Sequence, residues 1–173
     1  MSIFVTSDLH FGHKNIIEYE HRPYKNVQEM DKDLIEKWNE KVKPKDTIYV
    51  LGDFSWYDGE NTNKILKQLN GKKYLIIGNH DERFLEDKKF DKSLFEEICI
   101  YKEIKYNKQK YILFHYPIAE HRGKQKGYFH LYGHIHSSNL ELEKYLGASC
   151  FNVGVDRNDY RPVNIENLPQ DFL

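Results

Sequence analysis

Cysteine, excess charge of one sign and long apolar runs are all scarce in this sequence, and each absence excludes a class of protein. The chain has two cysteines, Cys99 and Cys150, each in an apolar run outside any metal-binding motif. We therefore expect buried free thiols, not a disulfide or a thiolate zinc site. The net charge of −1 gives no general basic footprint for nucleic acid, although a local patch stays open. No apolar run approaches the length of a membrane span.

Repeats, low-complexity tracts and evident linkers are also absent. A chain of 173 residues that is 39% hydrophobic is long enough to bury a core, and we expect one domain over residues 1–173. A strand pattern starts almost at the N-terminus, so we expect no secretory signal. Together these features favour a cytoplasmic protein and indicate no membrane partner.

Short runs of β-branched and aromatic residues without a helical period predict buried strands. These runs cover residues 3–7, 47–51, 74–77, 111–114, 129–132 and 150–155. Apolar residues at steps of three and four predict helices over 27–42 and 61–69, the second with Gly71 at its C-terminal cap. Strands that alternate with helices in the first half predict an α/β fold, and the strand-rich second half predicts a mixed sheet.

Two segments have weaker patterns. Residues 94–106 are predicted as a short helix that passes into a strand. In residues 137–149, Leu140 and Leu142 alternate with acidic residues, which favours an edge hairpin or a surface loop. His130 lies within a predicted strand, and we expect it to be packed, not catalytic.

Polar side chains follow five of the apolar runs, and they are the main functional signal. In an open α/β sheet, residues just beyond the carboxyl ends of strands converge although they are far apart in sequence. Carboxylate oxygens and imidazole nitrogens suit Mn, Fe, Zn, Ni or Co. A carboxylate such as Asp53 can bridge two cations about 3.5–4 Å apart, as in two-metal hydrolases. The candidate metal ligands are Asp8, His10, Asp53, Asn79, His115, His134 and His136.

The order of these motifs resembles that of the calcineurin-like metallophosphoesterase superfamily over residues 3–136. The matching pieces are Asp8-x-His10, Gly52-Asp53, Gly78-Asn79-His80-Asp81, His115 and Gly133-His134-x-His136. The string from Ser7 to Ile17 is similar to the small, single-domain branch found in bacteria and phages. The resemblance implies an α/β fold built as a four-layer α/β/β/α sandwich with mixed sheets.

The resemblance also implies a role for each matched residue. Asp53 would bridge two metal ions. His80 would contact the substrate phosphate and protonate the leaving oxygen, with Asp81 orienting His80. The first ion would be held by Asp8, His10, Asp53 and His136, and the second by Asp53, Asn79, His115 and His134.

Two further residues are candidates for substrate contact. His13 lies three residues after His10 and could reach the phosphate or merely cap a turn. Arg122 comes after the predicted strand that precedes His115. Its guanidinium could clamp a phosphate oxygen or stay exposed at the surface.

No serine or cysteine stands in an activated context, so chemistry by two cations is the simplest interpretation. Two cations would neutralise phosphate oxygens and turn a bridging water into the attacking hydroxide, while an imidazole protonates the leaving oxygen. We predict a dinuclear-metal-dependent phosphoester hydrolase, with Mn as the first candidate metal and a small phosphoester as substrate. The resemblance favours a phosphodiester, because small relatives without a large cap are often diesterases. The alternatives are a monoesterase acting on a nucleotide or phosphoprotein, a nuclease, and a metal-holding scaffold without turnover.

Overall fold

Nine strands form two mixed sheets in the computed structural model, which describes residues 1–138 and 140–168. The first sheet has the order β4–β3–β2–β1–β9 and consists of Glu97–Cys99, Lys72–Ile76, Thr47–Val50, Ile3–Thr6 and Val163–Asn164. The second has the order β5–β6–β7–β8 and consists of Tyr101–Tyr106, Gln109–Phe114, Phe129–Tyr132 and Cys150–Asn152. β9 is antiparallel to β1 and β5 is antiparallel to β6, whereas the other neighbours are parallel.

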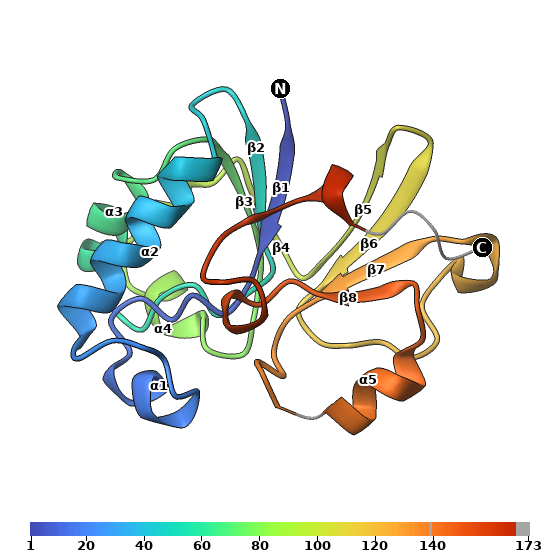
Figure 1. The fold of residues 1–173 in the computed structure, drawn as a ribbon. Coiled ribbons are helices and arrows are strands. Elements are labelled where there is room, and N and C mark those ends of the chain that lie inside the picture. Colours follow the sequence, from blue (N-terminus) through green and yellow to red (C-terminus); the bar gives the residue numbers. More distant parts are fainter. Residues whose placement is uncertain (139, 169–173) are drawn as a thin grey trace.

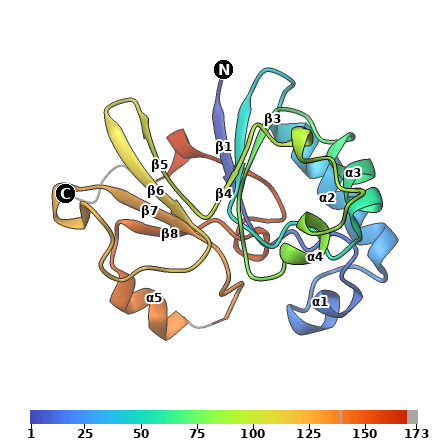
Figure 2. The same cartoon turned by 180° about the vertical axis from the view of Figure 1, so that it is seen from behind.

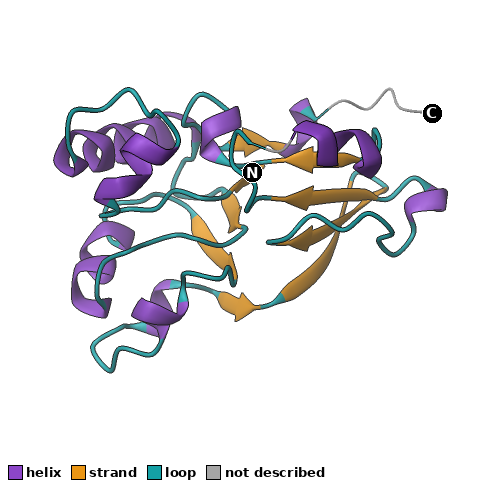
Figure 3. Cartoon of the chain, turned by 90° about the horizontal axis from the view of Figure 1, so that it is seen from below, coloured by secondary structure: helices purple, strands orange, loops and turns teal. Residues whose placement is uncertain are grey.

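Helices lie on the outer side of each sheet (Figure 1). α2 (Val27–Lys41) and α3 (Gly59–Leu66) pack on the first sheet, and α5 (Leu140–Leu146) packs on the second. The short helices α1 (Lys14–Tyr19) and α4 (Glu82–Leu85) follow β1 and β3 and lie beyond the ends of those strands. Viewed from below, the strands occupy the middle of the molecule (Figure 3). Single 3₁₀ turns cover Lys92–Leu94, Lys124–Lys126, Val155–Arg157 and Ile165–Asn167.

Successive side chains of the central strands point to opposite faces of the sheet, and this divides the core into two layers. Phe4 of β1 packs with Trp38 of α2 in the layer between the first sheet and its helices. The next residue, Val5, packs with Leu113 of β6 in the layer between the two sheets. The resulting order of helix, sheet, sheet and helix is the predicted four-layer sandwich, so the fold-class prediction is confirmed.

The segment 137–149 contains α5, so its prediction as a hairpin or loop was wrong. Leu142 and Leu146 are one helical turn apart and pack with Tyr132 and Ile135 of the second sheet and its following loop. Leucine and acidic residues alternate only briefly, and the spacing of four places the apolar residues on one face of a helix. Residue 139 of this segment lies outside the described residues.

The helix predicted over 61–69 is shifted towards the N-terminus. α3 begins at Gly59 because Asp58 caps it, and the Asp58 carboxylate accepts the Asn61 N–H at 2.8 Å. The helix ends before Leu69, so Gly71 is not its cap. Gly71 instead adopts a φ of 90° in the turn that leads into β3.

The prediction for residues 94–106 was also wrong in part. Only a short 3₁₀ turn precedes the strands, and residues 97–106 form two strands, not one. β4 belongs to the first sheet and β5 to the second, with Ile100 between them. The chain therefore crosses from one sheet to the other at this residue, as Figure 2 shows from behind.

The structure also bears on the cysteines and on the absence of long apolar runs. Cys99 and Cys150 are free thiols, as expected, although they are half-buried and not fully buried. Among the described helices, none combines the length and apolarity that crossing a bilayer requires.

His130 of β7 predicts an acid-sensitive step in stability. Its side chain is fully buried, Nδ1 donates to the Ile112 carbonyl, and Nε2 accepts the Ile118 N–H. Burial lowers the pKa of His130 from 6.5 to about 4. Above pH 6.5 the imidazole is neutral in both the folded and the unfolded protein. Between pH 6.5 and about 4 only the unfolded chain takes up the proton, so the protein becomes less stable as the pH is lowered.

We therefore expect His130 to account for about 2 kcal/mol of the stability lost between pH 7 and pH 5. Urea unfolding of the metal-stripped protein at both pH values, compared with His130→Gln, measures this share. The Gln variant should be less stable at pH 7 but lose less on acidification. Parallel losses in both proteins would show that another group is responsible.

Candidate metal centre

The predicted metal ligands lie on loops that follow strands of both sheets. Asp8 and His10 follow β1, Asp53 follows β2, and Asn79 follows β3 of the first sheet. His115 follows β6 of the second sheet, and His134 and His136 follow β7. The loops are tied together by backbone hydrogen bonds, including Asp8 N–H to Gly52 O and His10 N–H to Asp53 O, both 3.0 Å.

The backbone at these positions is unusual. Left-handed φ angles for residues other than glycine cost about 1–3 kcal/mol each, and they cluster at functional sites. Five of the seven predicted ligands adopt them: Asp8 (59°), His10 (54°), Asp53 (54°), His134 (70°) and His136 (47°). The fold therefore holds this group of residues in a conformation that their own preferences oppose.

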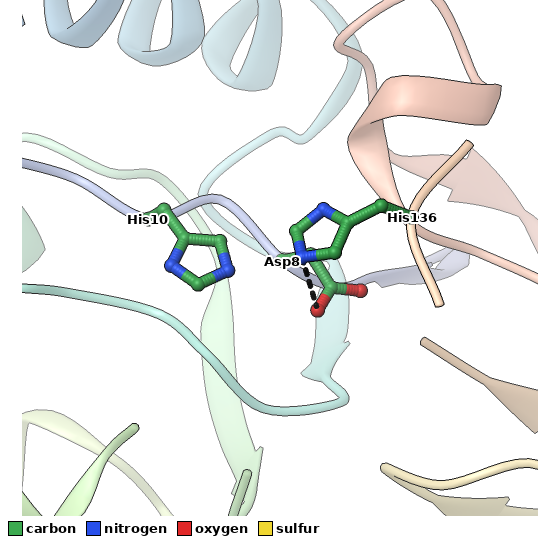
Figure 4. Close-up of side chains that lie close together, drawn as sticks. All are labelled: Asp8, His10 and His136. Atoms are coloured by element: carbon green, nitrogen blue, oxygen red, sulfur yellow. Dashed lines mark ion pairs between the residues drawn. The ribbon is translucent and has the colours of Figure 1, made fainter. Parts of the chain in front are cut away.

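One cluster consists of Asp8, His10 and His136, with one ligand atom from each within 4.8 Å of the others (Figure 4). His136 Nε2 lies 3.8 Å from Asp8 Oδ1, and His10 Nε2 lies 3.6 Å from Asp53 Oδ2. His10 Nε2 is buried and has no hydrogen-bond partner. A buried polar atom without a partner is costly, and a bound cation would satisfy it.

The second cluster consists of Asp53, His115 and His134, again within 4.8 Å. His115 Nδ1 donates to the Leu51 carbonyl at 2.7 Å, which leaves Nε2 of the neutral ring as an electron-pair donor. That nitrogen lies 2.9 Å from Asn79 Oδ1 and 3.6 Å from Asp53 Oδ2. His134 Nδ1 faces the same Asn79 oxygen at 3.0 Å. Electron-pair donors therefore converge, as they do around a metal ion.

The electrostatics of the two clusters also favour cations. Burial lowers the pKa of His10, His115 and His134, which keeps these imidazoles neutral and able to bind metal. Burial, reinforced by the nearby Asp53 carboxylate, raises the pKa of Asp8 to about 7. Burial opposes charge on His136 as well, but hydrogen bonding to Asp156 and the charge of Asp8 raise its pKa. The residues present fit two divalent ions.

The glycines of two motifs make room for these carboxylates. A Cβ atom on Gly133 would lie 2.0 Å from Ser7 Oγ and 2.3 Å from Asp8 Oδ2. A Cβ atom on Gly78 would lie 2.4 Å from Asp53 Oδ1. The Gly-Asn-His-Asp and Gly-His-x-His patterns therefore contain glycine because the backbone approaches a buried carboxylate.

His80 and Asp81 occupy different environments. His80 is exposed, its backbone N–H donates to Asp53 Oδ1 at 2.9 Å, and its ring centroid lies 5.8 Å from that of His10. We expected Asp81 to orient the His80 ring, but no such contact exists between these described residues. The buried Asp81 carboxylate instead accepts backbone N–H groups of Gly78, Asp53 and Phe54 at 2.7–3.0 Å. Asp81 therefore fixes the loops, not the His80 ring.

The two predicted substrate contacts also differ. His13 is the N-cap residue of α1, yet its side chain makes no capping hydrogen bond. Its ring stacks on Trp56, with centroids 4.1 Å apart, and lies 5.4 Å from the His10 ring. Arg122 is 74% exposed in its side chain, and its Nη1 donates to Glu103 of β5 at 2.9 Å. The structure thus brings His13 to the site but engages Arg122 elsewhere.

Arg22 and Asp156 lie beside the site, although the sequence favoured other roles for both. It placed Arg22 in a loop before Pro23, and it favoured a structural role for Asp156, which follows a predicted strand and could also support the site. In the structure Arg22 binds Asp156, and Asp156 accepts a hydrogen bond from His136 Nδ1 at 2.8 Å. No spacing signal could have revealed a pair that is 134 residues apart.

The fold and the histidine–aspartate clusters at the strand ends are those of a metallophosphoesterase. The chain belongs to the calcineurin-like phosphoesterase family, which it matches over residues 1–169. It is therefore a metal-dependent phosphoesterase, and the predicted family and enzyme class are confirmed.

Similar proteins occur in an archaeon, a phage and a bacterium. The uncharacterized protein MJ1445 of Methanocaldococcus jannaschii is 34% identical over 95% of this chain and 87% of its own length. The gene 66 protein of Mycobacterium phage L5 is 27% identical over 87% of this chain and 84% of its own. The crystal structure of the Aquifex aeolicus protein AQ665, of unknown function, is similar with a TM-score of 0.75. The identity is 28%, covering 95% of this chain and 96% of AQ665.

The close approach at Gly133 generates a prediction. Gly133→Ala should displace the Asp8 carboxylate and weaken metal binding by at least about tenfold. Gly127→Ala is the matched control, because a Cβ atom there meets nothing within 4 Å. Its left-handed φ of 75° should cost some stability without changing metal content. Elemental analysis and thermal unfolding of both variants measure the two effects. Full metal occupancy in Gly133→Ala would show that Asp8 does not need this position.

Proposed function

We propose that this phosphoesterase is a dinuclear enzyme that hydrolyses phosphodiesters. One observation carries the proposal: Asp53 Oδ2 lies 3.6 Å from both His10 Nε2 and His115 Nε2. The same carboxylate oxygen therefore faces both clusters, as a bridging ligand must. Asp8, His10 and His136 would complete one site, and Asn79, His115 and His134 the other.

The residues around the clusters have separate tasks in this mechanism. The two ions, when bound, would neutralise phosphate oxygens and lower the pKa of the attacking water. Hydrogen bonds from His115 Nδ1 to the Leu51 carbonyl and from His136 Nδ1 to the Asp156 carboxylate fix which ring nitrogen faces the centre. His80, exposed beside the first cluster, would give a proton to the leaving oxygen.

His13 would contact the substrate phosphate. Its ring lies 5.4 Å from that of His10, and stacking on Trp56 fixes the plane of the ring. A donor held in place before the substrate arrives loses little freedom on binding, so it can orient a phosphate oxygen efficiently.

The supply of positive charge favours a diester over a monoester. A monoester dianion carries two negative charges, and guanidinium groups beside the ions would strengthen its binding. Arg22, however, is buried against Asp156, and Arg122 is paired with Glu103 outside the site. This leaves Arg83, over the Trp56 ring at 5.9 Å, as the one guanidinium group among the described residues near His80. A diester carries one negative charge and needs less compensation. Rates on a monoester and a diester of the same chromogenic alcohol, with added Mn²⁺ as the proposed metal, test this preference.

Removal of the bridging carboxylate tests the dinuclear centre. Asp53→Ala should reduce bound Mn²⁺ from two ions per chain to one or none and abolish activity, because one carboxylate serves both sites. His10→Ala, which removes one ligand from one ion, should be milder. Metal content by elemental analysis and diester hydrolysis are measured together. Two tightly bound ions in Asp53→Ala would contradict a bridging role.

A change at His80 tests the chemistry separately from metal binding. His80→Ala should retain both ions and the fold but lose about 10²–10⁴-fold in rate on a diester with an alkoxide leaving group. The loss should be smaller for nitrophenolate, which departs without a proton. The comparison is kcat/KM of wild type and variant on both esters, with metal content in parallel. Equal losses on both esters would argue for phosphate positioning instead of proton transfer, and a missing ion would make His80 a ligand.

A further inference from the structure

Arg22 is a fully buried guanidinium group that touches the first cluster without belonging to it. It lies between α1 and α2, directly before Pro23, and its side chain is 0% exposed. Burial of a guanidinium group is costly unless all its donors are satisfied. Each of its three nitrogen atoms has an oxygen partner, and those partners decide what the group does.

Two of the partners are backbone carbonyls between the predicted ligands Asp8 and His10. Nη2 donates to Asp8 O at 2.8 Å, and Nη1 donates to Leu9 O at 2.9 Å. Asp8 and His10 have left-handed φ angles of 59° and 54°. The two hydrogen bonds fix the peptide groups on either side of Leu9, and so they fix the directions in which the Asp8 and His10 side chains leave the backbone.

The third oxygen-bearing partner is Asp156, in the 3₁₀ turn after β8. Arg22 Nε and Nη2 bind Asp156 Oδ1 and Oδ2 at 2.7 and 2.9 Å, a bidentate pair. Asp156 Oδ2 also accepts from His136 Nδ1 at 2.8 Å. This bond leaves His136 Nε2 facing Asp8, as in carboxylate–histidine–metal arrangements.

Asp156 itself is better explained as a partner of Arg22 than as a ligand of another ion. Glu20, His136 and Asp156 are close enough together to hold a cation. The positive charge is already present there as the guanidinium, and Glu20 accepts hydrogen bonds from the backbone and hydroxyl of Ser137. Asp156 therefore has its counter-charge, and Glu20 its hydrogen-bond donors, without a further ion.

We propose that Arg22 is a positioning residue for the first metal site: through two backbone carbonyls and Asp156 it fixes Asp8, His10 and His136 together. The proposal rests on the proposed dinuclear function. All the oxygen partners of Arg22 lead to this cluster, its other hydrogen bond is to the core sulfur of Met30, and none of its hydrogen-bond partners is Asn79, His115 or His134. Loss of Arg22 should therefore weaken the first site and spare the second.

Metal binding to the full chain tests this selectivity. Co²⁺ titration followed by visible absorption, with chelator competition, resolves the two binding steps in wild type. His10→Ala and His134→Ala identify which step belongs to which site. Arg22→Lys keeps the charge but loses the planar fork, and Asp156→Asn keeps the shape but loses the charge. Each should weaken the first step by about 10–100-fold and change the second less than about threefold. Arg161→Lys, which alters a half-exposed ion pair with Glu40, is the control and should change neither.

The outcomes separate this proposal from the dinuclear function. If wild type binds only one ion per chain, the dinuclear function fails. If both steps weaken equally, or if only the unfolding temperature falls while both affinities persist, Arg22 has a general structural role and the proposal is wrong. Failure of both variants to fold would also overturn it, because the pair would then determine the fold and not the first site.

Discussion

The carboxylate of Asp53 imposes the constraint on which the rest of this structure depends. One of its oxygens lies at the same distance, 3.6 Å, from a histidine that follows β1 and a histidine that follows β6. These strands belong to different sheets, so both contacts require that the carboxyl ends of the two sheets meet. The packing of Val5 against Leu113 between the sheets holds them in that position. The apolar core and the site are therefore two consequences of the same arrangement of layers.

This arrangement has a cost, which the chain offsets with hydrogen bonds. Left-handed backbone at five predicted ligands disfavours the site by about 1–3 kcal/mol per residue. Asp81 opposes this strain by accepting N–H groups from the loops after β2 and β3. Arg22 does the same for the loop after β1. Both residues act on the backbone, which helps to hold side chains from separate loops in one site.

The sequence predicted what depends on local pattern and missed what depends on distant contacts. The ligand positions were accessible because each follows an apolar run, and the topology of parallel strands then brings the loops together. Arg22 carries no such mark, and although Asp156 follows the predicted strand 150–155, its pairing with Arg22 spans 134 residues and is not visible in the sequence. Asp81 was assigned to its sequence neighbour His80, although its hydrogen bonds reach back to Asp53 and Phe54. The helix at 140–146 was missed because its apolar face is completed only by the sheet beneath it.

Charge balance at the centre connects these features to the choice of substrate. The predicted ligands include two carboxylates, Asp8 and Asp53, and burial keeps three of the imidazoles neutral. Two divalent ions would therefore leave a net positive charge of about two at the centre. A diester monoanion uses half of that charge and leaves the remainder to attract a negatively charged nucleophile. A monoester dianion would use all of it, and two guanidinium groups that could supply more, those of Arg22 and Arg122, are bound to Asp156 and Glu103. Burial of Arg22 thus has two consequences: the side chain organises the first cluster, and its positive charge is withheld from the substrate.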